Sequence, residues 1–367
     1  MCYPKIHMFP RYLRVLLRRN KMAGSTFGRY FTVMTWGESH GEAVGVVVDG
    51  CPAGLPLTEE DIQVLMDRRK PGQNKFTTAR KEEDEIHILS GVFEGKTTGT
   101  PISMMVKNKD QRSRDYSNVM DVYRPGHADY TFDEKYGFRD YRGGGRSSGR
   151  ETIGRVAAGA IAEKILETLG ISFETRVLEV GGIDGGDEEA VKAFLEKCMA
   201  EQDSAGGVVE CVIHGVPAGL GDPVFEKMDA NLAKAVMSIG AVKGVEIGDG
   251  FAVARTTGSR NNDNFYADEE GRVGKRTNHA GGVLGGMSDG SDIILRAAFK
   301  PTPSIAQEQE TINRKHENVT ISIHGRHDPI VVKRAMVVVE SMAALTVLDL
   351  LLANMHATMD GIKKFYR

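Results

Sequence analysis

Apolar residues recur along the chain in two rhythms, one typical of helices and one of strands. Residues 151–169 carry them at three- and four-residue spacing, which predicts an amphipathic helix. Ser148 and Glu151 match the capping box that starts such a helix. Short runs rich in β-branched residues predict strands at Ile102–Val106, Val208–Ile213, Ile293–Ala297 and Val319–Ile323.

Residues 335–355 form the most apolar stretch of the chain, and they are apolar on nearly every side. Such a stretch suits either a membrane span or a helix at the centre of a large protein. Glu340 and Asp349 interrupt it, and a charge at bilayer depth costs about 2.5 kcal/mol or more. We therefore predict a buried core helix.

Two segments of similar amino-acid sequence indicate an internal duplication. Residues 46–66 and 210–237 each contain an apolar strand, a G-x-P-A-G-L turn, a polar helix start and apolar residues at helical spacing. Thr58 and Asp61 form a capping pair in the first copy. A chance match of the turn is the alternative, but the matching context on both sides favours duplication. The pattern predicts two strand-helix halves that share one core.

The segment Gly37-Glu38-Ser39-His40-Gly41 fits the G-x-S-x-G pattern of a hydrolase nucleophile elbow. An elbow requires a helix directly after the serine. Residues 42–48 are instead largely β-branched, and residues 49–52 have the composition of a turn. The context is strand, turn and strand, so we expect Ser39 to orient His40 or to donate a hydrogen bond rather than to act as a nucleophile.

Composition and charge narrow the possible function classes. The 367 residues include 47 basic and 50 acidic ones, so the formal charge of −3 offers no global attraction to nucleic acid or to an anionic membrane. Any anion site must therefore be local. The four cysteines form no C-x-x-C pair, which argues against a zinc ribbon or a redox dithiol, and no metal site is predicted. A reducing compartment is the simplest setting.

Residues 1–21 contain six basic residues and no acidic one. An organelle presequence is one interpretation, because such segments are rich in arginine and poor in acids. We prefer a non-native or upstream-start extension before Met22. The prediction is one catalytic domain over residues 22–367, preceded by an extension that is disordered or non-native.

Four segments place anion-binding groups beside titratable ones: Arg68–Gly72, Arg124–Asp129, Tyr141–Glu151 and Gly325–Pro329. The first is equally typical of a solvated helix end, and a lone histidine in a loop is usually structural. The third places glycines, hydroxyls and arginines at a predicted helix N-terminus, which favours a phosphate. It lacks the Gly-Lys-Ser/Thr of a P-loop, so nucleotide hydrolysis is not indicated. The glycine clusters at 143–145 and 281–286 either allow a ligand to approach the backbone or form tight turns.

Taken together, these motifs resemble one family, chorismate synthase. The segments that resemble the family's sequence motifs are GESHGEAVGVVVDGCPAG, DRRKPG, DQRSRDY, YRPGHADYTFDEKYGFRDYRGGGRSSGRET, VKGVEIGDGF, NHAGGVLGGMSDG, KPTPSI and GRHDP. The resemblance runs from Met22 to about residue 355. It implies a single α+β domain, a β-α-β sandwich in which a helical core lies between antiparallel sheets with internal pseudo-symmetry.

The resemblance implies a lyase that converts 5-enolpyruvylshikimate 3-phosphate into chorismate and phosphate by anti 1,4-elimination. It also implies a requirement for reduced FMN (FMNH2) without net redox change, and a cytoplasmic homotetramer that binds neither nucleic acid nor membrane. Family members with their own NADPH-dependent flavin reductase activity usually have longer chains, so we expect an external flavin reductase here. The substrate carries a phosphate and two carboxylates, which guanidinium forks bind bidentately.

The resemblance further implies roles for individual residues. His40 corresponds to the acid that protonates the departing phosphate, His127 to a histidine near flavin N1, and Asp328 to the residue that works with flavin N5 in removing the ring hydrogen. The implied substrate clamp consists of Arg69, Lys75, Arg124, Ser148, Arg150 and Arg326. The implied FMN contacts are Arg146, Ser147, Ser148, Gly240, Ala241, Gly285, Lys300, Pro301, Thr302, Pro303, Ser304 and Arg326.

The chain departs from the family pattern at two of these positions. Lys75 stands where some members have arginine, so its contact is that of a single point charge. Gly240 stands where asparagine is frequent, which removes a side-chain hydrogen bond and leaves backbone contacts. Two rival functions remain at this stage, a phosphometabolite or nucleic-acid binder without catalysis and a serine hydrolase acting through Ser39.

Overall fold

Alternating burial along the strands explains why this sequence forms sheets around a helical layer. The computed structural model describes residues 24–70, 72, 83–109, 119–323 and 329–367, so the predicted extension at 1–21 lies outside the described residues. In β3 (Ala43–Asp49), Val44, Val46 and Val48 are buried, whereas Val47 is only partly buried. One face of the strand therefore packs on the core.

The first sheet is antiparallel and has five strands in the order β1-β2-β3-β7-β4. Besides β3 it contains β1 (Thr26–Phe27), β2 (Thr32–Gly37), β7 (Ile102–Lys107) and β4 (His87–Ile88). The second sheet is also antiparallel, with the order β11-β16-β10-β8-β9. Its strands are β8 (Ser172–Val180), β9 (Ile183–Asp184), β10 (Gly207–His214), β11 (Val242–Ile247) and β16 (Ile293–Phe299).

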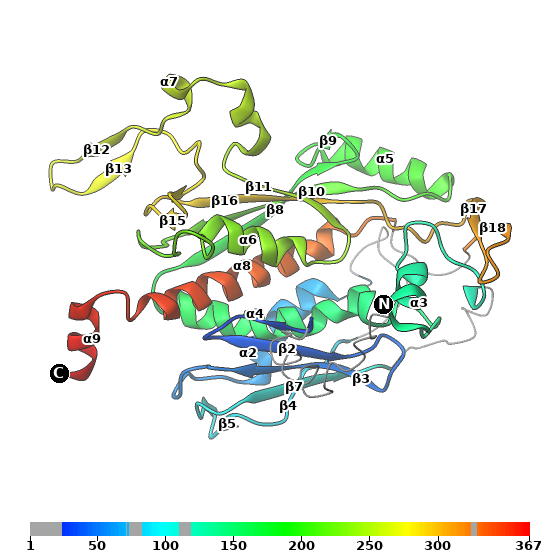
Figure 1. Ribbon diagram of the computed structural model, residues 1–367, viewed down its shortest axis with the longest axis horizontal. Helices are drawn as coiled ribbons and strands as arrows, with labels where there is room; N and C mark the ends of the chain where they lie inside the picture. The colour runs from blue at the N-terminus through cyan, green and yellow to red at the C-terminus, as the bar shows by residue number, and fades with distance from the viewer. Residues whose placement is uncertain (1–23, 71, 73–82, 110–118, 324–328) are drawn as a thin grey trace, which may run out of the picture.

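A layer of helices lies between the two sheets (Figure 1). The described helices are α2 (Glu59–Arg69), α3 (Asp129–Tyr136), α4 (Thr152–Glu167), α5 (Glu188–Ala200), α6 (Met228–Met237), α7 (Gly258–Asn261), α8 (Val332–Asn354) and α9 (Met359–Tyr366). Short 3-10 turns are η2 (Gly145–Ser147), η3 (Gly149–Glu151) and η4 (Gly250–Arg255). Two-stranded ribbons are formed by β5 (Val92–Phe93) with β6 (Lys96–Thr97), β12 (Phe265–Ala267) with β13 (Val273–Lys275), β14 (Val283–Leu284) with β15 (Met287–Ser288), and β17 (Gln309–Ile312) with β18 (Asn318–Ile321).

The long helices α4 and α8 pack against each other at the centre of the molecule (Figure 1). Helix α4 contacts the strands of the first sheet, and α8 contacts β8 and β10 of the second. Their close approach depends on Gly159, because a Cβ at this position would lie 2.2 Å from the Cβ of Ser341. The predicted α+β class, with a helical core between antiparallel sheets, is confirmed.

The predicted internal duplication is visible in the topology. Strand β3 lies between β2 and β7 and leads through the first G-x-P-A-G-L turn to α2. Strand β10 lies between β8 and β16 and leads through the second such turn to α6. Helix α2 packs on α4 as α6 packs on α8. The two halves therefore repeat one arrangement, and one contiguous set of buried residues joins them.

The predicted strands and the first capping pair are confirmed, but the second capping box is wrong. Thr58 accepts a hydrogen bond from the Asp61 amide, and the Asp61 carboxylate accepts one from Thr58 N. Ser148 does cap the turn that precedes α4, by accepting from Arg150 N at 3.3 Å. The Glu151 carboxylate does not return to Ser148, because it accepts from Thr35 Oγ1 at 2.8 Å and Arg155 Nε at 2.8 Å.

The two acidic residues of α8 have partners, which explains why a core helix carries them. In the most apolar part of α8, 78% of the residues are buried inside the protein, which confirms the predicted core helix. The Glu340 carboxylate accepts from Arg68 Nη1 at 2.6 Å and Nη2 at 2.7 Å. Asp349 accepts from three successive backbone amides, those of residues 29–31. Both carboxylates, the buried Glu340 and the partly buried Asp349, are compensated by donors from another part of the chain.

Glu163 on α4 is expected to make the stability of the fold depend on pH. Burial and the nearby charge of Glu340 raise the pKa of Glu163 from 4.5 to about 9, although Arg68 opposes the shift. The folded state therefore keeps a proton that the unfolded state releases above about pH 4.5. Stability is fully present below that pH and falls as the pH rises toward 9.

We predict that Glu163→Gln raises the free energy of unfolding at alkaline pH by about 1–3 kcal/mol, the usual cost of a poorly paired buried polar group. The gain should shrink as the pH falls toward about 5, because the wild-type carboxyl is then protonated in both states. Thermal unfolding followed by circular dichroism across this range measures it. Glu189→Gln, at an exposed position of α5, is the control. A gain that is independent of pH would contradict the protonation argument.

Candidate active site

Residues from both halves of the chain line a cavity of about 1210 Å³. Its wall is formed by the loop between β2 and β3, the end of α2, the segment that leads from α3 to α4, and the segments that follow α6 and β16. The cavity brings together most of the predicted site residues that the structure describes: His40, Arg69, Arg124, His127, Arg146, Ser147, Ser148, Arg150, Gly240, Ala241, Lys300, Thr302, Pro303 and Ser304.

His40 lies on the loop between β2 and β3 and is only 6% exposed. Its Nδ1 lies 3.2 Å from Ser39 Oγ. The glycine turn that precedes α4 packs directly on the imidazole, since a Cβ at Gly143 would lie 2.5 Å from His40 Cε1. The φ of Gly143 is +73°, which also favours glycine. At Gly143, therefore, the backbone forms a tight turn and its close neighbour is the His40 imidazole.

Arg69 and Arg150 meet at one buried carboxylate, that of Asp84. Arg69 is the last residue of α2, and its side chain is 1% exposed. It donates from Nη2 to Asp84 Oδ2. Arg150 donates from Nη1 to Asp84 Oδ1 at 3.1 Å and from Nε to Asn108 at 2.9 Å. One carboxylate thus orients two guanidinium groups in the cavity wall.

This cluster keeps a surplus of positive charge. Burial would raise the pKa of Asp84, but the charges of Arg69 and Arg150 hold that pKa below its ordinary value. Asp84 is therefore ionised at neutral pH, and two guanidinium charges face one carboxylate. Arg334 near the start of α8 also lines the cavity and donates from Nε to the carbonyl of Arg69 at 3.0 Å. An anionic ligand in the cavity would meet a net positive field.

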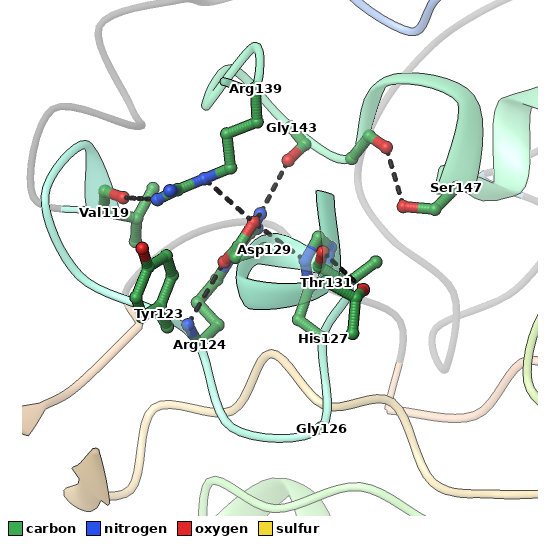
Figure 2. Close-up of polar contacts among 12 residues, drawn as sticks. Val119, Tyr123, Arg124, Gly126, His127, Asp129, Thr131, Arg139, Gly143 and Ser147 are labelled. Atoms are coloured by element: carbon green, nitrogen blue, oxygen red, sulfur yellow. Dashed lines mark hydrogen bonds and ion pairs between the residues drawn. The ribbon is translucent and has the colours of Figure 1, made fainter. Parts of the chain in front are cut away.

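Arg124 and His127 share a second carboxylate, that of Asp129 (Figure 2). Arg124 donates from Nε to Oδ2 at 2.7 Å and from Nη2 to Oδ1 at 2.8 Å. His127 Nδ1 lies 3.0 Å from Oδ1 of the same group. Arg124 Nη2 also donates to the carbonyl of Gly143 at 2.7 Å. The second cluster is therefore tied to the turn that packs on His40.

Two segments of the second half complete the wall. Residues 238–241 follow α6, and residues 300–304 follow β16. Lys300 Nζ donates to the carbonyl of Gly126, so these segments reach the loop that carries His127. Burial and the charge of Lys243 hold the pKa of Lys300 below its ordinary value. In the part of the chain that the structure describes, Thr302 Oγ1 is buried without a hydrogen-bond partner.

Comparisons with known proteins agree with this geometry. The family model described as chorismate synthase matches residues 31–352, a span that contains both arginine clusters and both histidines. The chain belongs to the chorismate synthase family. Similar curated relatives are chorismate synthases from Lachnospira eligens, 64% identical over 94% of this chain and 100% of the relative, and from Cytophaga hutchinsonii, 53% identical over 92% and 99%. A crystal structure of chorismate synthase superposes with a TM-score of 0.71 and 30% identity, covering 93% of this chain and 97% of that chain.

Chorismate synthases are carbon–oxygen lyases, and the chain is an enzyme of this class. It removes phosphate from 5-enolpyruvylshikimate 3-phosphate to give chorismate, the last common step of the shikimate pathway of aromatic amino acid biosynthesis. The assignment rules out the serine hydrolase and the non-catalytic binder. The structure agrees with this. A nucleophile elbow needs a helix directly after the serine, but the loop that carries Ser39 is followed by the strand β3.

Some residues that the chorismate synthase resemblance assigns to FMN also make bonds within the protein. Arg146 donates from Nη1 to the carbonyl of Gly37 at 3.1 Å and from Nη2 to Thr35 Oγ1 at 2.6 Å. Ser147 Oγ donates to the carbonyl of Gly144 at 2.7 Å. These bonds hold the glycine turn against the end of β2, so both residues shape the cavity whether or not they contact a ligand.

Two predicted FMN contacts are not among the residues that line this cavity. Gly285 lies in the turn of the β14-β15 hairpin, where it and Gly286 have φ values of +61° and +87°, as a tight two-residue turn requires. Pro301 packs against Gly206, because a Cβ there would lie 3.1 Å from Pro301 Cδ. Three further predicted residues, Lys75, Arg326 and Asp328, lie outside the described residues.

Several groups in or beside the cavity were not predicted from the sequence. Asp84 lies in a run of charged residues, a pattern more typical of a solvated surface, so nothing local marked it as buried. Arg334 and Arg155 line the cavity from the first turns of the two central helices, where their spacing carries no signal. Asp129 stood within the RPGHAD motif and was visible as a carboxylate two residues from His127.

Proposed function

We propose that the cavity is the active site and that it binds the enolpyruvyl phosphate substrate together with reduced FMN. The observation that supports this best is that two arginine-carboxylate clusters and two histidines, from segments far apart in sequence, converge on one cavity. The substrate carries a phosphate and two carboxylates. A protein of formal charge −3 can attract it only through such a local surplus of cations.

The proposed substrate clamp consists of Arg69, Arg124, Ser148 and Arg150, with Lys75 and Arg326 as further members from outside the described residues. Carboxylates on the protein side hold three of the arginines, so their guanidinium groups need little reorganisation when substrate binds. Such preorganisation favours bidentate binding of carboxylate and phosphate oxygens. Residue Ser148 adds a hydroxyl beside Arg150.

We assign the proton that reaches the departing phosphate to His40. An imidazole suits this role because its ordinary pKa lies near working pH, so it can hold a proton and release it. Ser39 and the Gly143 turn fix the ring in the cavity wall. Asp328 is proposed to take part in removal of the ring hydrogen, and His127 to lie near the FMN ring.

The cavity wall suits a flavin. Ile239, Phe299 and Val338 supply apolar surface, and Thr302 supplies a buried hydroxyl without a partner among the described residues. A Cβ at Gly240 would meet no atom within 4 Å, so this position faces open space. When bound, reduced FMN supplies electron density transiently to the allylic system, so that no net redox change accompanies the elimination. Arg146, Ser147, Ser148, Gly240, Ala241, Lys300 and residues 302–304 are the described residues that would hold it.

An anaerobic assay tests the proposal directly. Purified protein with dithionite-reduced FMN should form chorismate and phosphate from 5-enolpyruvylshikimate 3-phosphate, detected by the absorbance of chorismate. Oxidised FMN under the same conditions is the control and should give no product. If folded protein with reduced FMN forms no chorismate, the proposed function is wrong.

We further propose that another protein reduces the flavin, and that the enzyme works in the cytoplasm. The three cysteines that the structure describes, Cys51, Cys198 and Cys211, are buried free thiols, as a reducing compartment allows. An aerobic assay with NADPH and FMN alone tests the first point. Oxidation of NADPH by the pure protein would show an intrinsic reductase activity and contradict it.

We propose assembly into a homotetramer, and the outer faces of the two sheets support the location of one interface. The second sheet carries a charged outer face, on which Glu210 pairs with Arg176 and Arg296 at 2.6 Å and 2.8 Å. The first sheet instead presents Met34, which is 47% exposed, and Trp36, which is 36% exposed. An apolar outer face on a twisted sheet requires a cover, and its exposed charges, Asp49 and Lys107, lie at strand ends and have opposite signs.

Trp36→Lys is expected to weaken assembly by about tenfold or more in dissociation constant, because it places a charge in the proposed interface. Light scattering after gel filtration measures the mass of the assembly. Trp36 is the single tryptophan, so its fluorescence emission should also shift to longer wavelength when the wild-type protein is diluted. Arg176→Ala on the outer face of the second sheet is the control. An unchanged mass for Trp36→Lys would exclude this interface.

A further inference from the structure

Asp129 at the start of α3 is the centre of a polar cluster beside the cavity (Figure 2). Its side chain is 4% exposed. Oδ2 accepts from the backbone amide of Arg124 at 3.1 Å and from Arg124 Nε at 2.7 Å. Oδ1 accepts from Arg124 Nη2 at 2.8 Å and lies 3.0 Å from His127 Nδ1. One carboxylate therefore contacts two residues of the proposed active site.

The contact with Asp129 determines which nitrogen of His127 carries the proton. An ionised carboxylate can only accept hydrogen bonds, so His127 Nδ1 must be the donor. The other ring nitrogen, Nε2, faces the glycine turn of the cavity wall, because a Cβ at Gly144 would lie 3.4 Å from it. Nε2 is then the atom that the neutral imidazole offers as an acceptor to a ligand.

Arg139 fixes the carboxylate from behind. Its side chain is 3% exposed, and its Nε lies 3.6 Å from Asp129 Oδ1. Nη2 donates to the carbonyls of Val119 and Val122 at 3.0 Å, and Nη1 donates to Asp133 at 2.6 Å. Its guanidinium also lies over the ring of Tyr123, 5.0 Å from the centroid. Because these contacts leave Arg139 little freedom, it is a fixed cation beside Asp129.

The surrounding cations keep Asp129 ionised. Burial would raise the pKa of Asp129, but hydrogen bonds from Arg124 and His127, together with the charge of Arg124, hold that pKa well below its ordinary value. The carboxylate therefore remains an acceptor across the working pH range. Arg124 donates to the Asp129 carboxylate from Nε and Nη2, and among the described residues its Nη1 has no hydrogen-bond partner. Asp129 therefore holds the Arg124 guanidinium in an orientation that leaves Nη1 able to donate to an anionic ligand.

We infer that Asp129 is a positioning residue of the reaction: its single carboxylate sets the tautomer of His127 and the direction of the Arg124 guanidinium. The inference rests on the proposed function for the roles of His127 and Arg124. The contacts of Asp129 with His127 and Arg124 are present in the protein without substrate and do not depend on that proposal. Both groups are coupled through one carboxylate, so a change at Asp129 should affect turnover and substrate binding together.

The first test reads the tautomer in the wild-type protein without substrate or flavin. Long-range proton–nitrogen correlation of the histidine ring nitrogens distinguishes Nδ1-protonated from Nε2-protonated imidazole. The His127 signals are assigned by their loss in His127→Asn. We expect the neutral ring to carry its proton on Nδ1. A proton on Nε2 would overturn the inference, whether or not the protein forms chorismate.

The second test compares Asp129→Asn with the matched control Asp133→Asn. Both residues lie on α3, both are more than nine-tenths buried, and both substitutions remove one negative charge, but the described contacts of Asp133 include neither His127 nor Arg124. The side-chain amide introduced by Asp129→Asn can donate to Nδ1 and so favours the opposite tautomer. We expect about a 10²-fold loss of turnover and about a tenfold higher substrate KM in Asp129→Asn. Asp133→Asn changes one contact of Arg139 but leaves the contacts of Asp129 with His127 and Arg124 in place, so it should stay within about threefold of the wild type in both quantities.

A double-mutant cycle with His127→Ala separates positioning from general destabilisation. If Asp129 acts through His127, Asp129→Asn should have little further effect once His127 is absent. The loss of turnover in the His127→Ala background, on a logarithmic scale, should be less than about a third of the loss that Asp129→Asn causes in the wild type. The remaining effect should be on KM, through Arg124. Equal losses in both backgrounds, or a His127 tautomer unchanged in Asp129→Asn, would overturn the inference. Failure of the wild type to form chorismate would instead overturn the proposed function and leave the tautomer result intact.

Discussion

Replacement of His40 by alanine is expected to lower turnover by about 10²-fold or more while substrate still binds, as expected for the loss of a general acid. The imidazole is buried in the cavity wall between Ser39 and Gly143. Phosphate leaves poorly without a proton, and we assign no other described residue to this role. The turnover number is measured anaerobically with reduced FMN, and the substrate dissociation constant by calorimetry.

Two variants control for unspecific effects of the His40 substitution. His87 on β4 is a half-buried histidine that does not line the cavity, so His87→Ala should leave turnover unchanged. Ser39→Ala removes the hydroxyl beside His40 Nδ1 and should cost about tenfold or less, because the Gly143 turn still holds the ring. Turnover of His40→Ala within about threefold of the wild type would show that another group protonates the phosphate.

Replacement of Arg150 by alanine is expected to raise the substrate dissociation constant by about 10- to 100-fold. A hydrogen bond to a charged group contributes about 1.5–3 kcal/mol, and this range converts directly into that loss of affinity. The substitution also leaves the buried carboxylate of Asp84 with one described arginine partner fewer. The unfolding temperature should therefore fall as well, and both quantities need to be measured.

A second set of variants separates the binding role of Arg150 from its structural role. Arg150→Lys keeps the charge but loses the fork, so the dissociation constant should rise less than in Arg150→Ala. Arg150→Gln removes the charge but keeps an amide donor that can still reach the buried Asp84 carboxylate, so it should lose affinity like Arg150→Ala while losing less stability. An unchanged dissociation constant in Arg150→Ala would remove this residue from the clamp.

Local patterns in the sequence predicted those parts of the fold that depend on local physics. The periods of two and 3.6 residues located β7, β10, β16, α4 and α8 within a few residues. The repeated G-x-P-A-G-L turn predicted two similar halves, because the same residues after the same strand favour the same local structure. The Ser148–Glu151 capping box failed because Glu151 found stronger partners in Thr35 and Arg155. Arg155 is the local i,i+4 partner of Glu151, but Thr35 is 116 residues away, and no local pattern indicates that contact.

The motifs also marked most of the cavity wall, including His40, His127 and Arg150, because chemistry that binds a multiply charged anion restricts residue types in short stretches. The sequence did not mark the carboxylate that pairs with two of the arginines. Asp84 has the sequence surroundings of a solvated acid, yet it is buried and joins Arg69 to Arg150. Charge pairing across a fold depends on distance in space, which sequence separation does not report.

The sequence by itself therefore determined the periodic elements, the duplication and the set of residues fit for anion chemistry, since each of these depends on neighbours along the chain. Only the tertiary structure decided which of them meet. It turned Gly143 toward His40, placed Asp129 between Arg124 and His127, and left Gly285 in a hairpin turn away from the cavity wall. The reason is that burial and opposite charge act through space, so a carboxylate becomes an organiser of arginines only where the packed core brings them within hydrogen-bond distance.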